Sequence, residues 1–110
     1  MTRTNEYMTA HPELKELFDV IQTVKNADHV TVAVTTGNSR VTIVNRLEKP
    51  RINIAPIGDV ITLLILGRKA YSFDLSRIKI INIDSATGAT HRIKFSHMGD
   101  TYELEFSEKE

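Results

Sequence analysis

The most constraining stretch of this chain is a nearly continuous apolar run from Val60 to Leu66, interrupted only by Thr62. A run this short and this rich in branched side chains is typical of a strand that is covered on both faces. Neighbouring segments must supply that cover, and 110 residues are enough for one domain with one modest core. We therefore predict a single domain over residues 1–110, organised around this strand.

The segment that precedes the strands has the periodicity of a helix. Pro12 suits the first turn of a helix, where its missing N–H group costs nothing. Apolar side chains then recur at the i, i+3, i+4, i+7 spacing of one helix face, at Leu14, Leu17, Phe18, Ile21 and Val24. We predict a helix over residues 12–25 that packs this face into the core, and we expect residues 1–10 to be flexible.

Between residues 29 and 106 the apolar period changes to two, which indicates antiparallel strands. A two-residue loop at residues 37–38 would place Val34 opposite Val41 and keep the apolar faces of the first two strands together. Within residues 77–83 the apolar phase slips by one residue. Either both faces of this segment are covered, or a β-bulge re-aims the strand; we favour the bulge, because bulges are how small sheets bend.

The last hairpin is the best-specified part of the chain. A loop over residues 97–100 matches apolar with apolar and base with acid at every pair: Phe95 with Tyr102, Ile93 with Leu104, Lys94 with Glu103, and Arg92 with Glu105. Since cross-strand pairs of this kind stabilise a sheet, this register should prevail over its alternatives.

Together these segments predict an α+β domain in which an N-terminal helix is followed by six or seven short antiparallel strands. The strands should form a curled sheet or a small barrel, with the helix across one open end. In outline this order resembles the small-barrel group that includes Sm-like and SH3-like domains, and the hairpin over residues 90–106 is an addition to that pattern.

Several chemical functions find no support in the sequence. The absence of cysteine excludes disulfides, thiol nucleophiles and cysteine zinc sites. His91 and His97 fall at opposite ends of one predicted strand, about 20 Å apart, which is too far to share a metal ion. No serine lies in a nucleophile-elbow motif, and residues 67–69 lack the glycine spacing of a phosphate-binding loop. We therefore predict no enzymatic activity, no cofactor and no metal.

The sequence also predicts a cytoplasmic protein. The first residues are polar and lack the apolar core of a signal peptide. No apolar run approaches the ~18 residues that a membrane-spanning helix needs. We therefore expect no contact with a membrane.

Charge is distributed unevenly along the chain. Formal net charge is zero, but residues 40–94 hold ten bases against four acids, while both flanking regions are acidic. Arg92 and Lys94 are already matched with glutamates in the last hairpin. The remaining bases can form a positive rim for an anion, with Tyr71 as a stacking face: Arg40, Arg46, Lys49, Arg51, Arg68, Lys69, Arg77 and Lys79.

These observations leave more than one function open. The first hypothesis is a non-enzymatic, homo-oligomeric binding module whose basic rim holds RNA, single-stranded DNA or a nucleotide. The second is a protein-interaction or assembly subunit, for example a small phage or mobile-element protein, that docks through exposed strand edges. A third is a lipid- or peptide-binding domain of the pleckstrin-like kind, whose usual helix follows the strands instead of preceding them. The bases also fit ordinary surface charge that discourages edge pairing.

Overall fold

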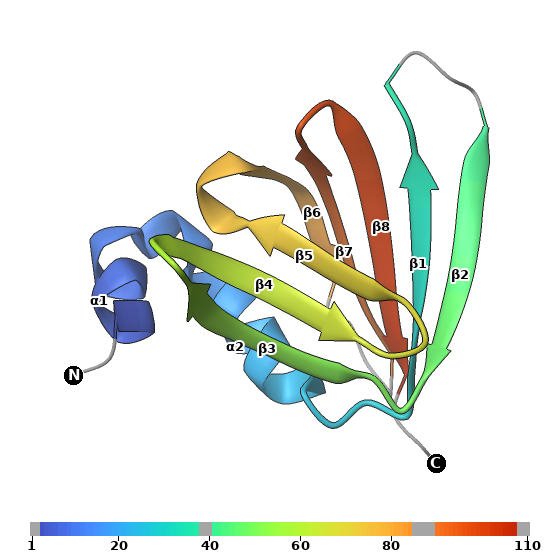
Figure 1. The fold of residues 1–110 in the computed structure, drawn as a ribbon, viewed down its shortest axis with the longest axis horizontal. Helices are drawn as coiled ribbons and strands as arrows, with labels where there is room; N and C mark the ends of the chain where they lie inside the picture. The colour runs from blue at the N-terminus through green and yellow to red at the C-terminus, as the bar shows by residue number, and fades with distance from the viewer. Residues whose placement is uncertain (1–2, 38–40, 85–89, 108–110) are drawn as a thin grey trace.

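The computed structural model describes residues 3–37, 41–84 and 90–107 of the chain. Within these residues the protein is an α+β domain with two helices and eight strands, which form two antiparallel sheets (Figure 1). The elements, with the two short 3₁₀ turns η1 and η2, are α1 (Arg3–Ala10), η1 (Pro12–Leu14), α2 (Lys15–Val24), β1 (His29–Thr35), β2 (Thr42–Glu48), β3 (Arg51–Ile57), β4 (Val60–Leu66), β5 (Ala70–Asp74), η2 (Leu75–Arg77), β6 (Ile78–Asp84), β7 (Thr90–His97) and β8 (Asp100–Ser107).

The strands do not close into a barrel, which was one of the two arrangements that the sequence predicted. The larger sheet has the order β2-β1-β8-β7-β6, so its first strand in sequence pairs with the last. The smaller sheet, β3-β4-β5, lies across one face of the larger one (Figure 1). After β2 the chain leaves the larger sheet at Lys49 and Pro50. The next strand, β3, pairs with β4 in the smaller sheet and not with β2. The predicted α+β class and antiparallel strands are confirmed, but the strands number eight and form two layers.

The central strand of the smaller sheet is the apolar run identified from the sequence. Ile61, Leu63 and Ile65 are buried on one face of β4. On the other face Val60 and Leu66 are exposed and only Thr62 is buried, so the prediction that both faces are covered is wrong. Its neighbours β3 and β5 supply the flanking backbone hydrogen bonds. β3 tolerates Pro56 because it is an edge strand, where a missing N–H group breaks no ladder.

An aromatic cluster joins the two sheets. The ring of Phe73, on β5, lies 5.0 Å from the ring of Phe95 and 4.7 Å from that of Tyr102, both in edge-on geometry. Phe73 and Phe95 are fully buried. Edge-on aromatic pairs are favourable beyond the area that they bury, so this contact fixes the smaller sheet against β7 and β8.

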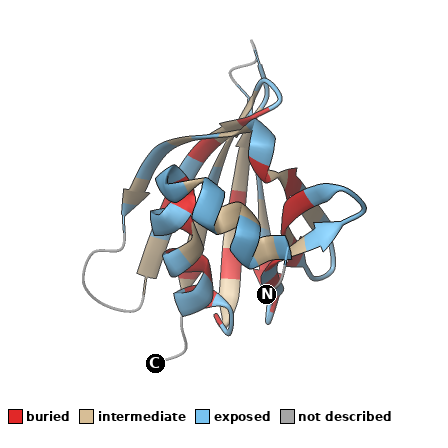
Figure 2. Ribbon diagram, turned by 90° about the vertical axis from the view of Figure 1, so that its left-hand side faces the viewer, coloured by how far each residue is buried: buried red, intermediate tan, exposed pale blue. Residues whose placement is uncertain are grey.

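The predicted helix is present over most of its length. Its first turn is η1, and α2 then buries the predicted stripe at Leu14, Leu17, Ile21 and Val24, with Phe18 half-buried. α2 contacts both β3 and β7, so it covers the open side between the two sheets (Figure 2). The helix α1, over residues 3–10, was not predicted from the sequence; it contacts β3 and β4.

The register predicted for the last hairpin and the bulge predicted before it are both confirmed. All four predicted pairs of the last hairpin occur in β7–β8, and Arg92 Nε donates to Glu105 Oε2 at 3.0 Å. Met98 and Gly99 turn the chain with positive φ at both positions, as a two-residue hairpin loop requires. The bulge is also present: the β6–β7 register shifts between Ile80 and Asn82, which leaves Ile81 exposed.

The predicted register of the first hairpin is wrong. In the structure Val34 lies opposite Ile43 instead of Val41, and Val32 lies opposite Asn45. The pairing is shifted by two residues, so the connection is longer than the two-residue loop that was predicted. A shift of two residues keeps every side chain on its original face, and apolar alternation therefore cannot distinguish the two registers.

No helix within the described residues is long and apolar enough to cross a membrane.

Candidate functional site

The connection between β2 and β3 is the centre of the candidate site. Lys49 adopts a left-handed backbone conformation with φ of 46°, which is uncommon for a residue with a side chain. Its N–H donates to the carbonyl oxygen of Asp28 at 2.7 Å. This bond ties the β2–β3 connection to the segment that leads from α2 into β1, so that two distant stretches of the chain meet at one corner.

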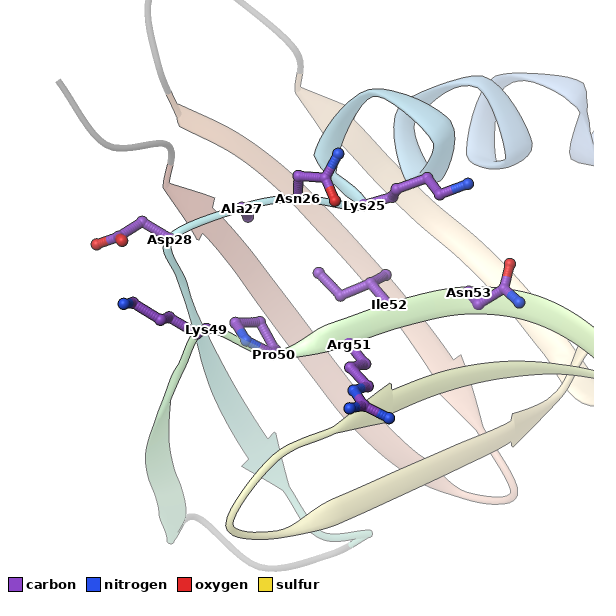
Figure 3. A pocket seen from close by; sticks show the side chains of 9 residues that line it. All are labelled: Lys25, Asn26, Ala27, Asp28, Lys49, Pro50, Arg51, Ile52 and Asn53. Atoms are coloured by element: carbon purple, nitrogen blue, oxygen red, sulfur yellow. The ribbon is translucent and has the colours of Figure 1, made fainter.

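An open pocket of about 630 Å³ lies at this corner (Figure 3). The end of α2 and the segment after it form one wall, and the start of β3 forms the other. The pocket lining includes three cationic side chains, one carboxylate and two amides, namely Lys25, Lys49, Arg51, Asp28, Asn26 and Asn53. Lys25 was not among the predicted binding residues, because in sequence it belongs to the acidic N-terminal region.

The cationic groups of this pocket do not converge on one point. Figure 3 shows Lys49 and Asp28 extending to the same side of the opening, while Lys25 extends along α2. The guanidinium of Arg51 points away from α2, toward the β4–β5 hairpin. The pocket is therefore a diffuse positive surface and not a preformed clamp around a single small anion.

A second basic pocket, of about 310 Å³, lies on the other side of the β2–β3 connection. Its walls are the C-terminal part of β2 and the turn between β4 and β5, and its lining is Asn45, Arg46, Leu47, Arg68 and Lys69. The turn approaches β2 closely at Gly67, where an added Cβ would lie 3.4 Å from the Cβ of Leu47. Arg51 pairs with Leu66, one residue before this turn, so the two pockets adjoin.

We call these six exposed cations, Lys25, Arg46, Lys49, Arg51, Arg68 and Lys69, the basic corner. Arg46 is paired: its Nε lies 2.8 Å from Glu48 Oε1. Over residues 3–37, 41–84 and 90–107, no ion pair involves the other five cations. Two carboxylates, Asp28 and Glu48, lie beside the six cations, so the corner carries an excess of positive charge.

Tyr71 does not present the exposed stacking face that the sequence suggested. Its ring is half-buried and lies parallel to that of Phe73, with ring centroids 6.3 Å apart. Its hydroxyl oxygen accepts a hydrogen bond from Asn45 Nδ2 at 3.0 Å. The Tyr71 hydroxyl therefore orients Asn45 at the second pocket, and the half-buried ring is only partly accessible to a ligand.

The remaining predicted binding residues lie elsewhere or are not described. Arg77, in η2, lies 3.4 Å from the carboxylate of Asp74, at the end of β5 that is remote from the basic corner. Lys79 is exposed on β6, the opposite edge of the larger sheet from β2. Arg40 falls outside the described residues. The structure thus brings together five of the predicted cations, adds Lys25, and separates Arg77 and Lys79 from them.

A cluster of possible metal ligands adjoins the basic corner. Donor atoms of Asp28, His29 and Glu48 lie within 4.8 Å of one another. A cationic group already contacts this cluster, because Arg46 Nε bonds Glu48 and Arg46 Nη2 lies 3.3 Å from His29 Nδ1. A metal ion would have to displace that guanidinium against the positive charge of the corner. We therefore assign no metal to it.

The sequence analysis missed this cluster because of the wrong hairpin register. In the predicted pairing His29 would lie opposite Arg46, whereas in the structure it lies opposite Glu48. Asp28 and His29 are adjacent in the sequence, but Glu48 comes close to them only in the correct register of β1 and β2.

A second polar cluster lies at the far end of β5, and its groups are internally satisfied. Asp74 Oδ1 accepts hydrogen bonds from the Ser76 hydroxyl at 2.7 Å and from the Ser76 N–H at 2.9 Å, and these bonds lower the pKa of Asp74. The N–H of Asp74 donates to Nε2 of the buried His97 at 3.1 Å. Burial lowers the pKa of His97, which keeps the imidazole neutral and able to accept this bond.

Comparisons of the chain with models of protein families, with curated proteins and with solved structures give no match. The function must therefore be argued from the geometry and charge of the site itself.

Proposed function

We propose that this protein is a non-enzymatic binding module that holds a phosphate-bearing anion, such as RNA, single-stranded DNA or a nucleotide, at the basic corner. The observation that carries the proposal is the excess of exposed cations without ion-pair partners at a single corner of the described chain. Elsewhere in the molecule, cations such as Lys15, Arg77 and Arg92 lie beside carboxylates.

Unpaired cations at close quarters repel one another, and an anionic ligand relieves that repulsion. Phosphate contacts by lysine and arginine release counterions from a nucleic acid, which makes such binding strong at low salt and weak at high salt. The polar side chains of the two pockets are cations and amides with the single carboxylate of Asp28, and the residues described there include no nucleophile–base pair. Binding without chemistry is the function that this arrangement supports best.

A salt titration with a matched pair of variants tests the proposal. Lys49→Gln combined with Arg51→Gln removes two charges from the basic corner, whereas Arg77→Gln combined with Lys79→Gln removes two charges from elsewhere. We expect the first variant to lose at least about tenfold in affinity for a labelled oligonucleotide at low salt, by fluorescence anisotropy. We expect the control variant to bind as the wild type does.

Three results would count against the proposal. They are weak binding of every phosphate-bearing probe even at low salt, an affinity that does not fall as salt rises, or an equal loss in both variants. Far-ultraviolet circular dichroism of each variant establishes that any loss of binding is not a loss of folding.

A second candidate function, assembly through strand edges, is favoured by the state of β2. This edge strand exposes more than half of Ile43 and Val44, one on each face of the sheet. Other edges are protected: β6 carries a bulge and Lys79, and β3 contains Pro56 and contacts both helices. β2 has neither a bulge nor a proline within its described length, and its two charged residues, Arg46 and Glu48, lie in its C-terminal half.

The partner that fits this edge is a second copy of the chain, pairing antiparallel across a two-fold axis. β2 carries one cation, Arg46, and one anion, Glu48, so two copies bring no net charge to the contact. Light scattering should then give a dimer for the wild type and a monomer for Val44→Lys, which places a charge on the edge. A wild-type monomer at high protein concentration would rule this candidate out.

A further inference from the structure

We infer that the ligand of the basic corner is a nucleic acid strand that crosses the β2–β3 connection and places one phosphate in each of the two pockets. This inference rests on the proposed function and narrows it from any phosphate-bearing anion to a polymeric one. A single phosphate, a free nucleotide and an inorganic polyphosphate are thereby excluded as the preferred ligand.

The first ground is the presence of two separate basic pockets instead of one. Lys49 and Arg51 line the larger pocket, and Arg68 and Lys69 line the smaller one. The linings come close to each other, because Leu47 belongs to the smaller pocket and Lys49 to the larger. Two residues of extended chain span only about 7 Å, so the backbone of one short strand can reach both linings. Phosphates of one strand can therefore occupy both pockets.

The second ground is the way in which the cations point. Lys25, Lys49 and Arg51 fan outward in different directions from the larger pocket (Figure 3). A site for one small phosphate gathers several donors on a single group, often backbone N–H groups at a helix N-terminus. Here the chain segment beside the pocket is the C-terminal end of α2, which presents carbonyl groups and no row of free N–H groups that could gather on one phosphate. Cations that point in different directions can contact several phosphates of a strand, whereas they cannot all contact one small anion.

The third ground is the amide groups that accompany the cations. Asn26 and Asn53 line the larger pocket, and Asn45 lines the smaller one. Asn45 Nδ2 donates one of its two N–H groups to the Tyr71 hydroxyl, which leaves the second N–H group and the side-chain carbonyl oxygen for a ligand. An amide offers both donors and acceptors, whereas a polyphosphate offers acceptors alone. Sugars and bases supply the complementary donors, so the amides favour a nucleic acid.

The test compares four probes and four variants, the fourth of which combines the two pocket variants described next. The probes are inorganic phosphate, thymidine monophosphate, inorganic polyphosphate and a short single-stranded oligothymidylate. Lys49→Gln with Arg51→Gln disables the larger pocket, and Arg68→Gln with Lys69→Gln disables the smaller one. Arg77→Gln with Lys79→Gln is the matched control, with the same loss of charge at a distance from both pockets.

For the oligonucleotide, we expect each pocket variant to lower the slope of log affinity against log salt concentration by about 0.7, and a combined variant by about 1.4. The control should leave the slope unchanged. We expect oligothymidylate to bind at least about tenfold more tightly than thymidine monophosphate or polyphosphate, because only the strand offers both linked phosphates and hydrogen-bond donors.

The outcomes separate this inference from the proposed function. Equal affinity for thymidine monophosphate and the oligonucleotide would overturn the two-pocket inference and leave the proposed function standing. The same holds if only one pocket variant affects binding, or if polyphosphate binds as tightly as the strand. If none of the four probes binds at low salt, the proposed function itself fails.

Discussion

The two ends of β5 show how differently this protein treats its charges. At the first end, Arg68 and Lys69 extend from the turn into an open pocket and contact no carboxylate within the described residues. At the other end, the carboxylate of Asp74 accepts a hydrogen bond from Ser76 and lies near Arg77. The backbone N–H group of Asp74 donates to His97.

The comparison teaches which polar groups serve the fold and which are available to a ligand. Groups whose partners come from the chain itself, as at Asp74, contribute to stability and leave little to bind anything else. Cations without partners contribute nothing favourable to stability and are the groups that an anion can neutralise. The following predictions test this distinction, beginning with the largest expected effect.

Phe73→Ala removes the ring that joins the two sheets at the satisfied end of β5. Because Phe73 is fully buried and meets Phe95 and Tyr102, we expect the free energy of unfolding to fall by about 3–5 kcal/mol. Urea denaturation followed by circular dichroism measures the loss. Phe73→Leu is the control and should lose less, since it leaves a smaller cavity. An alanine variant as stable as the wild type would show that the aromatic cluster does not hold the sheets together.

His97→Leu leaves the N–H of Asp74 without its acceptor in a part-buried position. We expect a loss of about 1–3 kcal/mol in the free energy of unfolding, because a buried donor then has no partner. His97→Gln keeps an acceptor oxygen and should lose less. Oligonucleotide affinity should stay unchanged in both variants. A loss of affinity as large as that of the corner variants would contradict the separation of the two ends.

The stability of the wild type should depend on pH through His97. Burial lowers the pKa of His97 below its ordinary value of 6.5, although Asp74 and Asp100 oppose that shift and Arg77 reinforces it. As pH falls below about 6.5 the unfolded chain binds a proton that the folded chain refuses, so stability should fall with it. Urea midpoints at pH 7.5 and pH 5.5 measure this change. In His97→Leu the change should be smaller; an equal change would assign it to other groups.

The smallest effect is expected at the basic corner, and it has the opposite sign. Lys49→Gln with Arg51→Gln removes repulsion between exposed cations, so the free energy of unfolding at low salt should stay within about 0.5 kcal/mol of the wild type or rise slightly. Added salt should abolish any gain, because it screens the repulsion. Thermal melts at low and high salt measure this difference. A clear destabilisation would show that these cations serve the fold.

The comparison of the two hairpins shows how far the sequence could predict the fold. In β7–β8, the four consecutive pairs from Arg92–Glu105 to Phe95–Tyr102 alternate between matched charges on one face and matched apolar side chains on the other, so a shifted register mismatches some of them. In β1–β2 only the apolar alternation was informative, and a shift of two residues preserves it. The bulge in β6 was predictable because an extra residue changes the phase of the apolar pattern itself.

The candidate site was only partly predictable, for a related reason. An excess of bases in the middle of the chain was visible in the sequence, and so were five of the six cations that meet at the corner. Lys25 was missed because its sequence neighbours are acidic. Arg77 and Lys79 were grouped with these cations because they are close to Lys69 in the sequence. In the structure they follow β5, whereas Arg68 and Lys69 precede it, so the length of this strand separates them from the basic corner.

The sequence alone determined several elements of this protein, namely the amphipathic helix, the apolar strand β4, the bulge and the last hairpin. Neighbouring residues or directly opposed pairs specify each of them. The tertiary structure alone decided how the strands divide between two sheets, and thereby which cations meet. That division depends on β1 pairing with β8, at opposite ends of the chain, and on the β2–β3 connection turning away at Lys49. Contacts between distant segments leave no periodic trace in a single sequence, because each segment's local pattern is compatible with several partners.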